Sequence, residues 1–376
     1  MWVVRPRTLE TKHSHNRGKR INQKELEWMI GPIPIDDGFG KELTLQYETT
    51  IRNEGIWYTD SNGREFQKRK RNHRSTFDVS GLEPIASSFY PVNAAAYIQD
   101  ENATFSVVVD RSQGVASLID GSLEFLVRRR LLVDDRRGVG DPLNETTRGM
   151  SPYPPYGTAE RQGDGAHVSG KHRISYSFGH AEDLSGMQGA SLSRRQMDTA
   201  FSEPCVFMTT KDNGARVPMD KKSFSLMKKT LPPNVMLMTF AALPNKDSTF
   251  LVRLGHQYAA GEDPELSKPV TVCLFEIIGH ELKKVTEKTL SGNRDYHDWV
   301  KHRKVWTDEG ENEDDEEKSN TNEVPTSPTQ EERTIEKDGR YTVELKPMEI
   351  RTFEVEVYTK RQESRTRVPI GQTANP

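Results

Sequence analysis

Residues 108–138 read VVDRSQGVASLIDGSLEFLVRRRLLVDDRRG, and this stretch decides the fold class. The runs at 105–109 and 123–127 are rich in β-branched and aromatic residues, which is typical of strands. The charged end of the stretch leads into Gly138, Gly140 and Pro142, which are turn residues. The sequence therefore predicts short strands that end in a charged loop.

The charged end, RRRLLVDDRRG at 128–138, gathers arginines and aspartates around three aliphatic residues. Binding residues often collect on loops that a rigid scaffold holds. A guanidinium on such a loop can bind a polar ligand through two parallel hydrogen bonds. The alternative is a solvated hairpin whose surface ion pairs add little stability. This segment alone leaves both interpretations open.

Short strand-like runs recur along the chain, and long amphipathic helical patterns are missing. Residues 43–47 alternate with period two, as half-buried strands do. The turn Asp60-Ser61-Asn62-Gly63 is a strong hairpin signal, because Asn-Gly readily adopts positive φ. Further β-branched or aromatic runs lie at 97–99, 235–240, 250–254, 270–278 and 352–357. The pattern predicts a mainly β protein built from β-sandwiches.

The length of 376 residues allows two or three domains. We expect an unstructured lead-in at 1–24, a large sandwich at 25–240, a smaller terminal sandwich at 241–358 and a tail at 359–376. Residues 147–200 are rich in Gly, Ser, Tyr and Pro, which predicts a long loop. The acidic segment 308–333 predicts a disordered insertion, because like charges repel and apolar residues are few.

Composition narrows the class of protein. Hydrophobic residues make up 33% and charged residues 29%, which is typical of a polar but foldable chain. The net charge of −3 argues against a nucleic-acid or acidic-membrane partner. No run reaches the roughly 18–20 apolar residues of a membrane span, and the apolar run 2–4 is too short for a signal peptide. Cys205 and Cys273 are too few for a disulfide framework, and whether they form one bridge stays open.

Several motifs, taken in order and spacing, resemble the C-terminal β-rich half of the class II α-mannosidases of the lysosomal or vacuolar type, glycoside hydrolase family 38. The resemblance covers roughly 25–357 and is broken at 147–230 and 308–333. The motifs are ELEWMIGPIPIDDGFGKEL (25–43), WYTDSNGREFQKR (57–69), FYPVNAAAYIQD (89–100), the DRSQG to DDRRG block within 108–146, LPPNV (231–235), VRLGHQYAAGED (252–263) and LKPMEIRTFEV (345–355).

The resemblance implies a galactose-mutarotase-like super-β-sandwich followed by a smaller sandwich. Enzymes of this family are zinc-dependent retaining glycosidases that release α-linked mannose from N-glycans, with two carboxylates flanking the scissile bond. Their catalytic carboxylates and zinc ligands belong to an N-terminal part. The resemblance therefore implies no catalytic residue, metal or cofactor in this chain, and no activity when it is alone. It also implies a lysosomal, vacuolar or secretory location.

The same resemblance assigns a contact with substrate hydroxyls to Arg137 in the DD-x-RG loop. Asp134 and Asp135 would orient that loop, and a purely structural role is the preferred interpretation for both. Arg136 stands where related sequences carry Asn, Gly or Glu. Which of the two arginines points inward is therefore open.

Other features have simpler interpretations. His13-Ser14-His15-Asn16 resembles the family's zinc signature, but Arg17 replaces the ligand aspartate, and two histidines are too few for zinc. The basic run 64–74 has one interleaved aromatic, which favours a charged strand or turn over a nucleic-acid site. Asn102 and Asn144 begin glycosylation sequons. His256 is expected to be a hydrogen-bonded residue of a strand.

A function from another class remains possible on the sequence. The chain could be a stand-alone, non-catalytic β-sandwich that binds a carbohydrate or a protein. A degenerate fragment without function is a weaker third reading.

Overall fold

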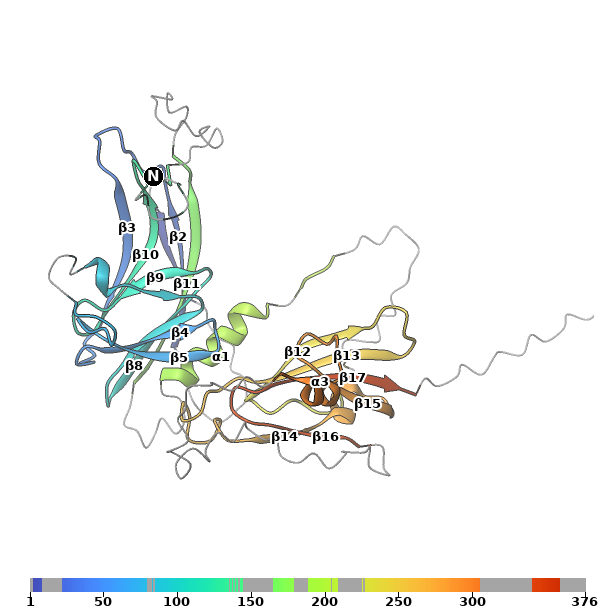
Figure 1. Ribbon diagram of the computed structural model, residues 1–376. Coiled ribbons are helices and arrows are strands. Elements are labelled where there is room, and N and C mark those ends of the chain that lie inside the picture. The colour runs from blue at the N-terminus through green and yellow to red at the C-terminus, as the bar shows by residue number, and fades with distance from the viewer. Residues whose placement is uncertain are drawn as a thin grey trace, which may run out of the picture. The chain divides into compact units, whose positions relative to one another are not determined.

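The computed structural model describes residues 3–8, 22–79, 83, 85–134, 136, 138, 140, 143–144, 165–178, 189–203, 205–208, 225, 227–304 and 340–358. The chain forms two compact units (Figure 1). The first comprises residues 1–215 and 257–268, and the second comprises 216–256 and 269–376. Antiparallel sheets dominate both units, so the predicted mainly β fold is confirmed.

The first unit is a sandwich of two antiparallel sheets. The larger sheet has seven strands in the order β1 (Val3–Thr8), β2 (Asn22–Ile30), β11 (Val168–Phe178), β8 (Ala103–Val109), β7 (Ala95–Gln99), β4 (Ile56–Ser61) and β5 (Glu65–Lys70). The smaller sheet has the order β3 (Lys41–Glu48), β10 (Ser122–Arg130), β9 (Gln113–Ala116) and β6 (Tyr90–Val92). A short 3₁₀ turn, η1 (Ala86–Ser88), precedes β6.

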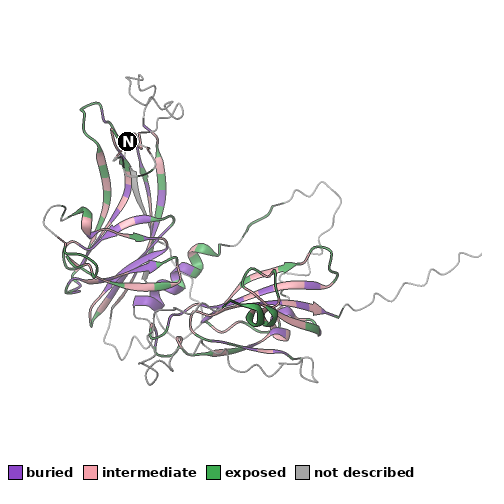
Figure 2. Ribbon diagram, viewed as in Figure 1, coloured by how far each residue is buried: buried purple, intermediate pink, exposed green. Residues whose placement is uncertain are grey.

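The core of the first unit lies between these sheets, because alternate residues of each strand point inward. Trp28, Trp57 and Phe125 are among its largest fully buried side chains. Buried positions recur along the strands in Figure 2. Helix α1 (Gly189–Phe201) packs on β7, β8 and β11. Met197 of α1 joins Val108 in a second, smaller apolar cluster.

The second unit is a smaller sandwich. Its four-stranded sheet has the order β12 (Val235–Ala242), β13 (Thr249–His256), β17 (Ile350–Val357) and β15 (Leu282–Lys288). Strands β14 (Val270–Cys273) and β16 (Thr342–Leu345) form the second sheet, and the helices are α2 (Leu274–Ile278) and α3 (Tyr296–His302). The core between them includes Val252, Leu254, Val343, Leu345 and Phe353.

Several expected boundaries differ from the structure. The lead-in 1–24 contains β1 and the start of β2, and the expected loop 147–200 contains β11 and most of α1. These elements have weak sequence signals, because β11 uses His172, Ser175 and Gly170 at buried positions. Helix α1 likewise buries Ser193 and Arg194 alongside its apolar residues. Polar partners supplied by the fold allow His172, Ser193 and Arg194 to be buried, whereas the Ser175 hydroxyl is buried without a hydrogen-bond partner among the described residues.

The division between the units also differs from the expected boundary at 240/241, which falls inside β12. The second unit begins at 216, and residues 257–268 return to the first. The expected strand 270–278 is β14 followed by the short helix α2. The remaining expected strands at 43–47, 97–99, 105–109, 123–127, 235–240, 250–254 and 352–357 are strands. The acidic segment 308–333 and the tail 359–376 lie outside the described residues.

Candidate functional site

The three consecutive arginines at 128–130 lie in strand β10 and not in the loop that follows it. A bulge between Leu126 and Arg128 shifts the register against β3. Arg129 is exposed and pairs with Glu42 at 3.2 Å. Arg130 is 6% exposed, and its Nη1 donates to the carbonyl oxygen of Ile33 at 2.7 Å. Arg130 therefore ties the end of β10 to the segment that follows β2.

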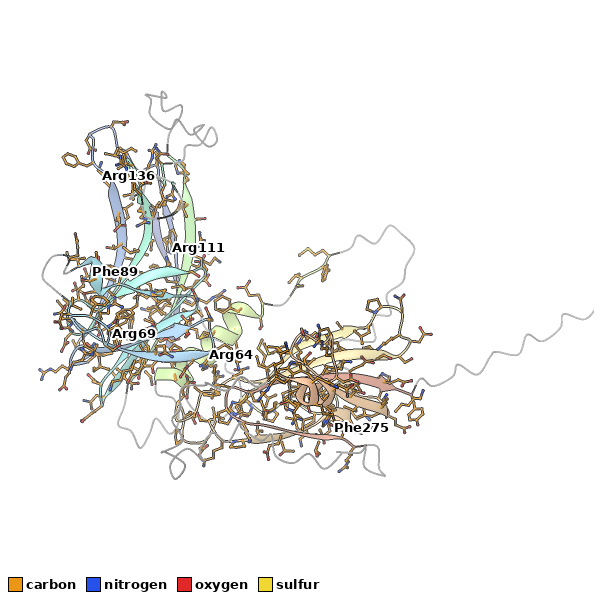
Figure 3. All side chains as sticks on the ribbon, viewed as in Figure 1. Arg64, Arg69, Phe89, Arg111, Arg136 and Phe275 are labelled. Atoms are coloured by element: carbon orange, nitrogen blue, oxygen red, sulfur yellow. The ribbon has the colours of Figure 1, made fainter. Side chains whose placement is uncertain are left out.

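The loop after β10 begins with a local turn. The backbone N–H of Arg136 donates to Asp134 Oδ1 at 2.5 Å, and Arg136 has a φ of 55°. Short polar side chains commonly hold such turns by hydrogen bonds to a backbone N–H two residues on. Arg136 is exposed at the end of the smaller sheet (Figure 3). Asp135 and Arg137 lie outside the described residues, so their roles and that of Asp134 stay predictions.

The β2–β3 connection, residues 31–40, ends beside this loop, because Lys41 pairs with Arg130 across the sheet. Asp37 accepts a hydrogen bond from Lys41 Nζ at 2.7 Å, and this bond is the main cause that lowers the pKa of Asp37. Phe39 is 69% exposed, and Val133 on the loop is 75% exposed. We call this end of the sandwich, residues 31–41 and 130–138, the arginine-loop end. It offers apolar and charged groups together, as interaction surfaces do.

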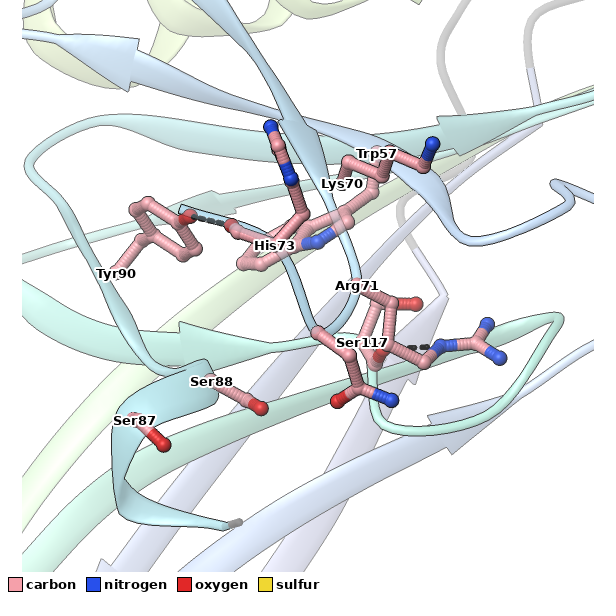
Figure 4. Close-up of a pocket in the computed structure, with 9 residues that line it drawn as sticks. Trp57, Lys70, Arg71, His73, Ser87, Ser88, Tyr90 and Ser117 are labelled. Atoms are coloured by element: carbon pink, nitrogen blue, oxygen red, sulfur yellow. Dashed lines mark hydrogen bonds between the residues drawn. The ribbon is translucent and has the colours of Figure 1, made fainter. Parts of the chain in front are cut away.

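The basic run 64–74 forms the edge strand β5 and the turn after it. The guanidinium groups of Arg69 and Arg74 lie 4.3 and 3.7 Å from the centre of the Tyr90 ring. Figure 4 shows the small recess beside them, where Tyr90 Oη donates to the His73 carbonyl and Arg71 Nε donates to that of Ser117. The interpretation as a charged edge strand is confirmed. The expectation of no nucleic-acid partner stays untested.

The other candidates are placed as follows. His256 is fully buried at the end of β13, and its Nε2 lies 3.3 Å from Asn234 Nδ2, as expected for a core histidine. Asn102 is exposed in the turn before β8, and Asn144 is half-buried. Neither observation tests glycosylation. Cys205 and Cys273 both carry free thiols.

The zinc-like segment 13–16 lies outside the described residues. Within the described ranges, no group of three or more His, Cys, Asp or Glu side chains could hold a metal ion. The described residues therefore offer no ligand set for zinc. Among the helices that the structure describes, none is long and apolar enough to cross a membrane.

Two buried polar networks were not predicted from the sequence. His172, fully buried on β11, lies 2.8 Å from Tyr47 Oη through Nδ1 and 2.8 Å from Gln113 Oε1 through Nε2. Burial is the main cause that lowers the pKa of His172 to about 4. The second network joins Arg194 of α1 to Glu262 at 3.0 Å. Only the motif VRLGHQYAAGED hinted at Glu262, and nothing in the sequence connected it to residue 194.

Comparison with known proteins agrees with the architecture. Residues 18–137 match the glycosyl hydrolases family 38 C-terminal domain. This chain carries a family 38 C-terminal domain. The match contains all strands from β2 to β10 and the start of the loop after β10.

Relatives of this family 38 chain extend the likeness beyond that domain. Lysosomal alpha-mannosidase of Bos taurus is 37% identical over 340 residues, which cover 89% of this chain and 30% of the relative. The human protein of the same name is 36% identical over 89% of this chain and 29% of its own length. Probable alpha-mannosidase At5g13980 of Arabidopsis thaliana is 35% identical over 91% and 31%. The chain thus spans about 30% of the length of these relatives.

A crystal structure of a family 38 protein from Enterococcus faecalis aligns with a TM-score of 0.47 at 14% identity, over 89% of this chain and 28% of its own.

Proposed function

We propose that this chain forms the C-terminal sandwich part of an α-mannosidase that hydrolyses terminal α-linked mannose of N-glycans in the lysosome, the vacuole or the secretory pathway. Likeness to lysosomal alpha-mannosidases over 89% of the chain is the observation that carries the proposal. In this role the chain buttresses a catalytic part that supplies the nucleophile, the acid/base carboxylate and zinc. The isolated chain is then inactive.

The arginine-loop end is the surface through which the chain acts in this proposal. Arg130 and the bulged strand β10 fix where the loop starts, because a buried guanidinium bonded to a carbonyl resists displacement. Arg137 would donate to substrate hydroxyls from that loop. Asp134 and Asp135 would hold the loop in shape, in line with the bond between Asp134 and the Arg136 amide.

A chimera tests this proposal. Residues 25–357 replace the corresponding C-terminal part of bovine lysosomal alpha-mannosidase, and hydrolysis of p-nitrophenyl α-D-mannoside is measured. The chimera is expected to be active, whereas the 376-residue chain alone is expected to release no product even with added zinc. In the chimera, Arg137→Ala is expected to lower kcat/KM by about 10- to 100-fold, as the loss of a charged hydrogen bond to substrate does.

Arg129→Ala is the matched control, because Arg129 forms an ion pair with the exposed carboxylate of Glu42. It is expected to keep kcat/KM within about twofold, since exposed ion pairs contribute little. A folded chimera without activity contradicts the proposal. Equal losses in the Arg129 and Arg137 variants contradict the role of Arg137.

The alternative of a stand-alone carbohydrate- or protein-binding sandwich predicts binding without any catalytic partner. The chain alone would then bind a carbohydrate or a protein, and this binding would be independent of mannoside hydrolysis by the chimera.

A further inference from the structure

A recess of about 460 Å3 lies near the end of β2 and the start of β11, beside the turn that follows β8. This volume falls within the usual range of small-molecule sites. Three segments line the recess: Glu27, Trp28 and Met29 of β2, Asp110 and Arg111 of the turn, and Ser169, Gly170 and Lys171 of β11. All of them belong to the first unit.

The guanidinium of Arg111 is held in place before any ligand arrives. Its Nε donates to Asp110 Oδ1 at 3.1 Å, and its Nη2 donates to Asp110 Oδ2 at 2.9 Å and to the Ser169 carbonyl at 2.6 Å. The backbone N–H of Lys171 donates to the same Asp110 Oδ2 at 3.1 Å. Arg111 is labelled beside β11 in Figure 3. A donor fixed in this way loses little side-chain entropy when it binds.

The charges of the recess are balanced. Glu27 and Asp110 contribute two carboxylates, and Arg111 and Lys171 contribute two cations. Lys171 Nζ also lies 3.3 Å from carboxylate oxygens of both Glu25 and Glu27. Because no net charge remains among the lining residues, the recess selects neither an anion nor a cation. It suits a neutral ligand that both donates and accepts hydrogen bonds, which is the property of sugar hydroxyls.

Further groups of the recess remain available. The Ser169 hydroxyl and Arg111 Nη1 have no hydrogen-bond partner among the described residues. Met29 is 44% exposed and offers apolar surface to the C–H groups of a sugar ring.

Trp28 supplies an independent observation. This residue is 1% exposed, and its indole Nε1 has no hydrogen-bond partner within the described structure. Buried donors without partners are rare in folded proteins, and Trp28 is one of the residues that line the recess. Gly170 allows the indole to lie against β11, because a Cβ there would sit 2.2 Å from Cζ2 of Trp28.

We propose that this recess binds a neutral sugar residue through Arg111, Ser169 and the paired carboxylates, independently of the arginine-loop end. The choice of a mannoside as the probe rests on the proposed function.

Binding of α-1,2-mannobiose to the 376-residue chain, measured by isothermal titration calorimetry and saturation-transfer NMR, tests the inference. We expect saturable binding, with a Kd in the millimolar range that a single small recess provides. Arg111→Ala is expected to weaken binding about tenfold, because it removes fixed charged donors. Arg129→Ala is the matched control: it removes the same charge and one exposed ion pair, and it is expected to leave the Kd unchanged.

A second variant protects the test against a folding defect. Ser169→Tyr places a large side chain at an exposed strand position and fills the recess, while Arg111 stays in place. We expect it to abolish binding and to keep the far-ultraviolet circular dichroism spectrum of the parent chain. Competition with sodium sulfate at constant ionic strength is expected to leave mannobiose binding unchanged, because the lining is neutral.

The inference is overturned by no saturable binding, by equal binding of the parent chain and both recess variants, or by displacement of mannobiose by sulfate. Binding that is lost in Arg137→Ala but kept in Arg111→Ala also overturns it, since that result assigns the sugar to the arginine loop. Failure of the recess leaves the chimera experiment unaffected, so the two proposals can fail separately.

Discussion

His172 shows how a single titratable residue can be kept in a β-sandwich core. One ring nitrogen lies 2.8 Å from Tyr47 Oη and the other lies 2.8 Å from Gln113 Oε1. A neutral ring satisfies both contacts, with Nε2–H donating to Gln113 and Nδ1 accepting from Tyr47. Burial opposes the charged form, which is why the pKa falls to about 4.

This burial makes stability depend on pH. Between pH 6.5 and about 4 the unfolded chain binds a proton at His172 that the folded chain does not. Stability therefore falls as pH drops below about 6.5 and stops falling, for this group, below about 4. Because of this group, the free energy of unfolding is about 3 kcal/mol lower below pH 4 than above pH 6.5, at roughly 1.4 kcal/mol for each pKa unit. His172→Gln is expected to remove this contribution in urea unfolding measured from pH 4 to 7.

His280→Gln is the control, because His280 is exposed. It is expected to reproduce the pH profile of the parent chain. An unchanged profile in His172→Gln would contradict this account, because it would show that folding does not shift the pKa of His172.

Arg194 shows the cost of burying a charge on a helix. It is 4% exposed, and its Nη1 donates to the Gly63 carbonyl at 2.9 Å, while Glu262 accepts from Nη2 at 3.0 Å. Glu262 also accepts from the backbone N–H groups of Ala259 and Phe66, at 3.0 and 3.1 Å. One carboxylate thus neutralises the helix charge, bonds to β5 through Phe66 and holds a turn of its own segment through Ala259.

Glu262→Ala leaves the Arg194 guanidinium buried without this carboxylate. We expect a loss of about 3–5 kcal/mol in the unfolding free energy of the first unit, as broken buried ion pairs give. Glu265→Ala, three residues away and exposed, is expected to stay within about 0.5 kcal/mol. Calorimetry of both variants checks the difference, and equal melting temperatures would contradict the importance of the pair.

At the scale of elements, the β4–β5 hairpin shows sequence and structure in agreement. Asn62 and Gly63 have φ values of 52° and 70°, the positive values that the two central residues of a type I′ turn require, and the Arg64 N–H closes this turn on the Ser61 carbonyl at 3.0 Å. Asp60 accepts from the Gly63 N–H at 2.7 Å, and its other oxygen accepts from the N–H groups of Asn93, Ala94 and Ala95. The aspartate of this motif therefore ties the hairpin to the start of β7.

Substitution of Gly63 and of Gly170 by alanine tests two different effects: the cost of a left-handed backbone conformation and the cost of overpacking. At Gly63 a Cβ would meet only atoms 3.8 Å away or farther, so Gly63→Ala is expected to cost about 1–2 kcal/mol for the left-handed conformation alone. At Gly170 a Cβ would overlap the buried indole of Trp28, so Gly170→Ala is expected to cost about 3 kcal/mol through overpacking. Chemical denaturation measures both, and a smaller loss for Gly170→Ala would refute the packing argument.

At the scale of the whole molecule, the two units are not consecutive in the chain. Residues 257–268 leave the second unit and return to the first, where Glu262 meets Arg194 and Asp263 Oδ2 accepts from the Ser191 hydroxyl at 2.5 Å. The first unit is therefore incomplete without a segment that follows β12 and β13. A polypeptide that ends at residue 215 therefore lacks part of the polar network of the first unit.

A polypeptide of residues 1–215 is expected to lack a cooperative thermal transition, because Arg194 and Ser191 lose their buried partners. Joining 257–268 to that polypeptide through a flexible Gly/Ser linker is expected to restore the transition. The same fusion carrying Glu262→Ala serves as the control and is expected to fail. A cooperative transition in residues 1–215 alone would contradict the role given to the returning segment.

The mainly β class, most strands and the hairpin at Asn62-Gly63 could be predicted from the sequence, since period-two alternation and positive φ are local properties. Through motif order the sequence also determined the family resemblance. It missed β11 and α1, because their buried positions include His172, Ser175 and Arg194, which a hydrophobic pattern does not mark. Only the tertiary structure decided these elements, by supplying partners from distant segments: Tyr47 and Gln113 for His172, and Glu262 for Arg194. The recess at Arg111 has the same origin, because its charges balance only when β2, β11 and the turn after β8 meet.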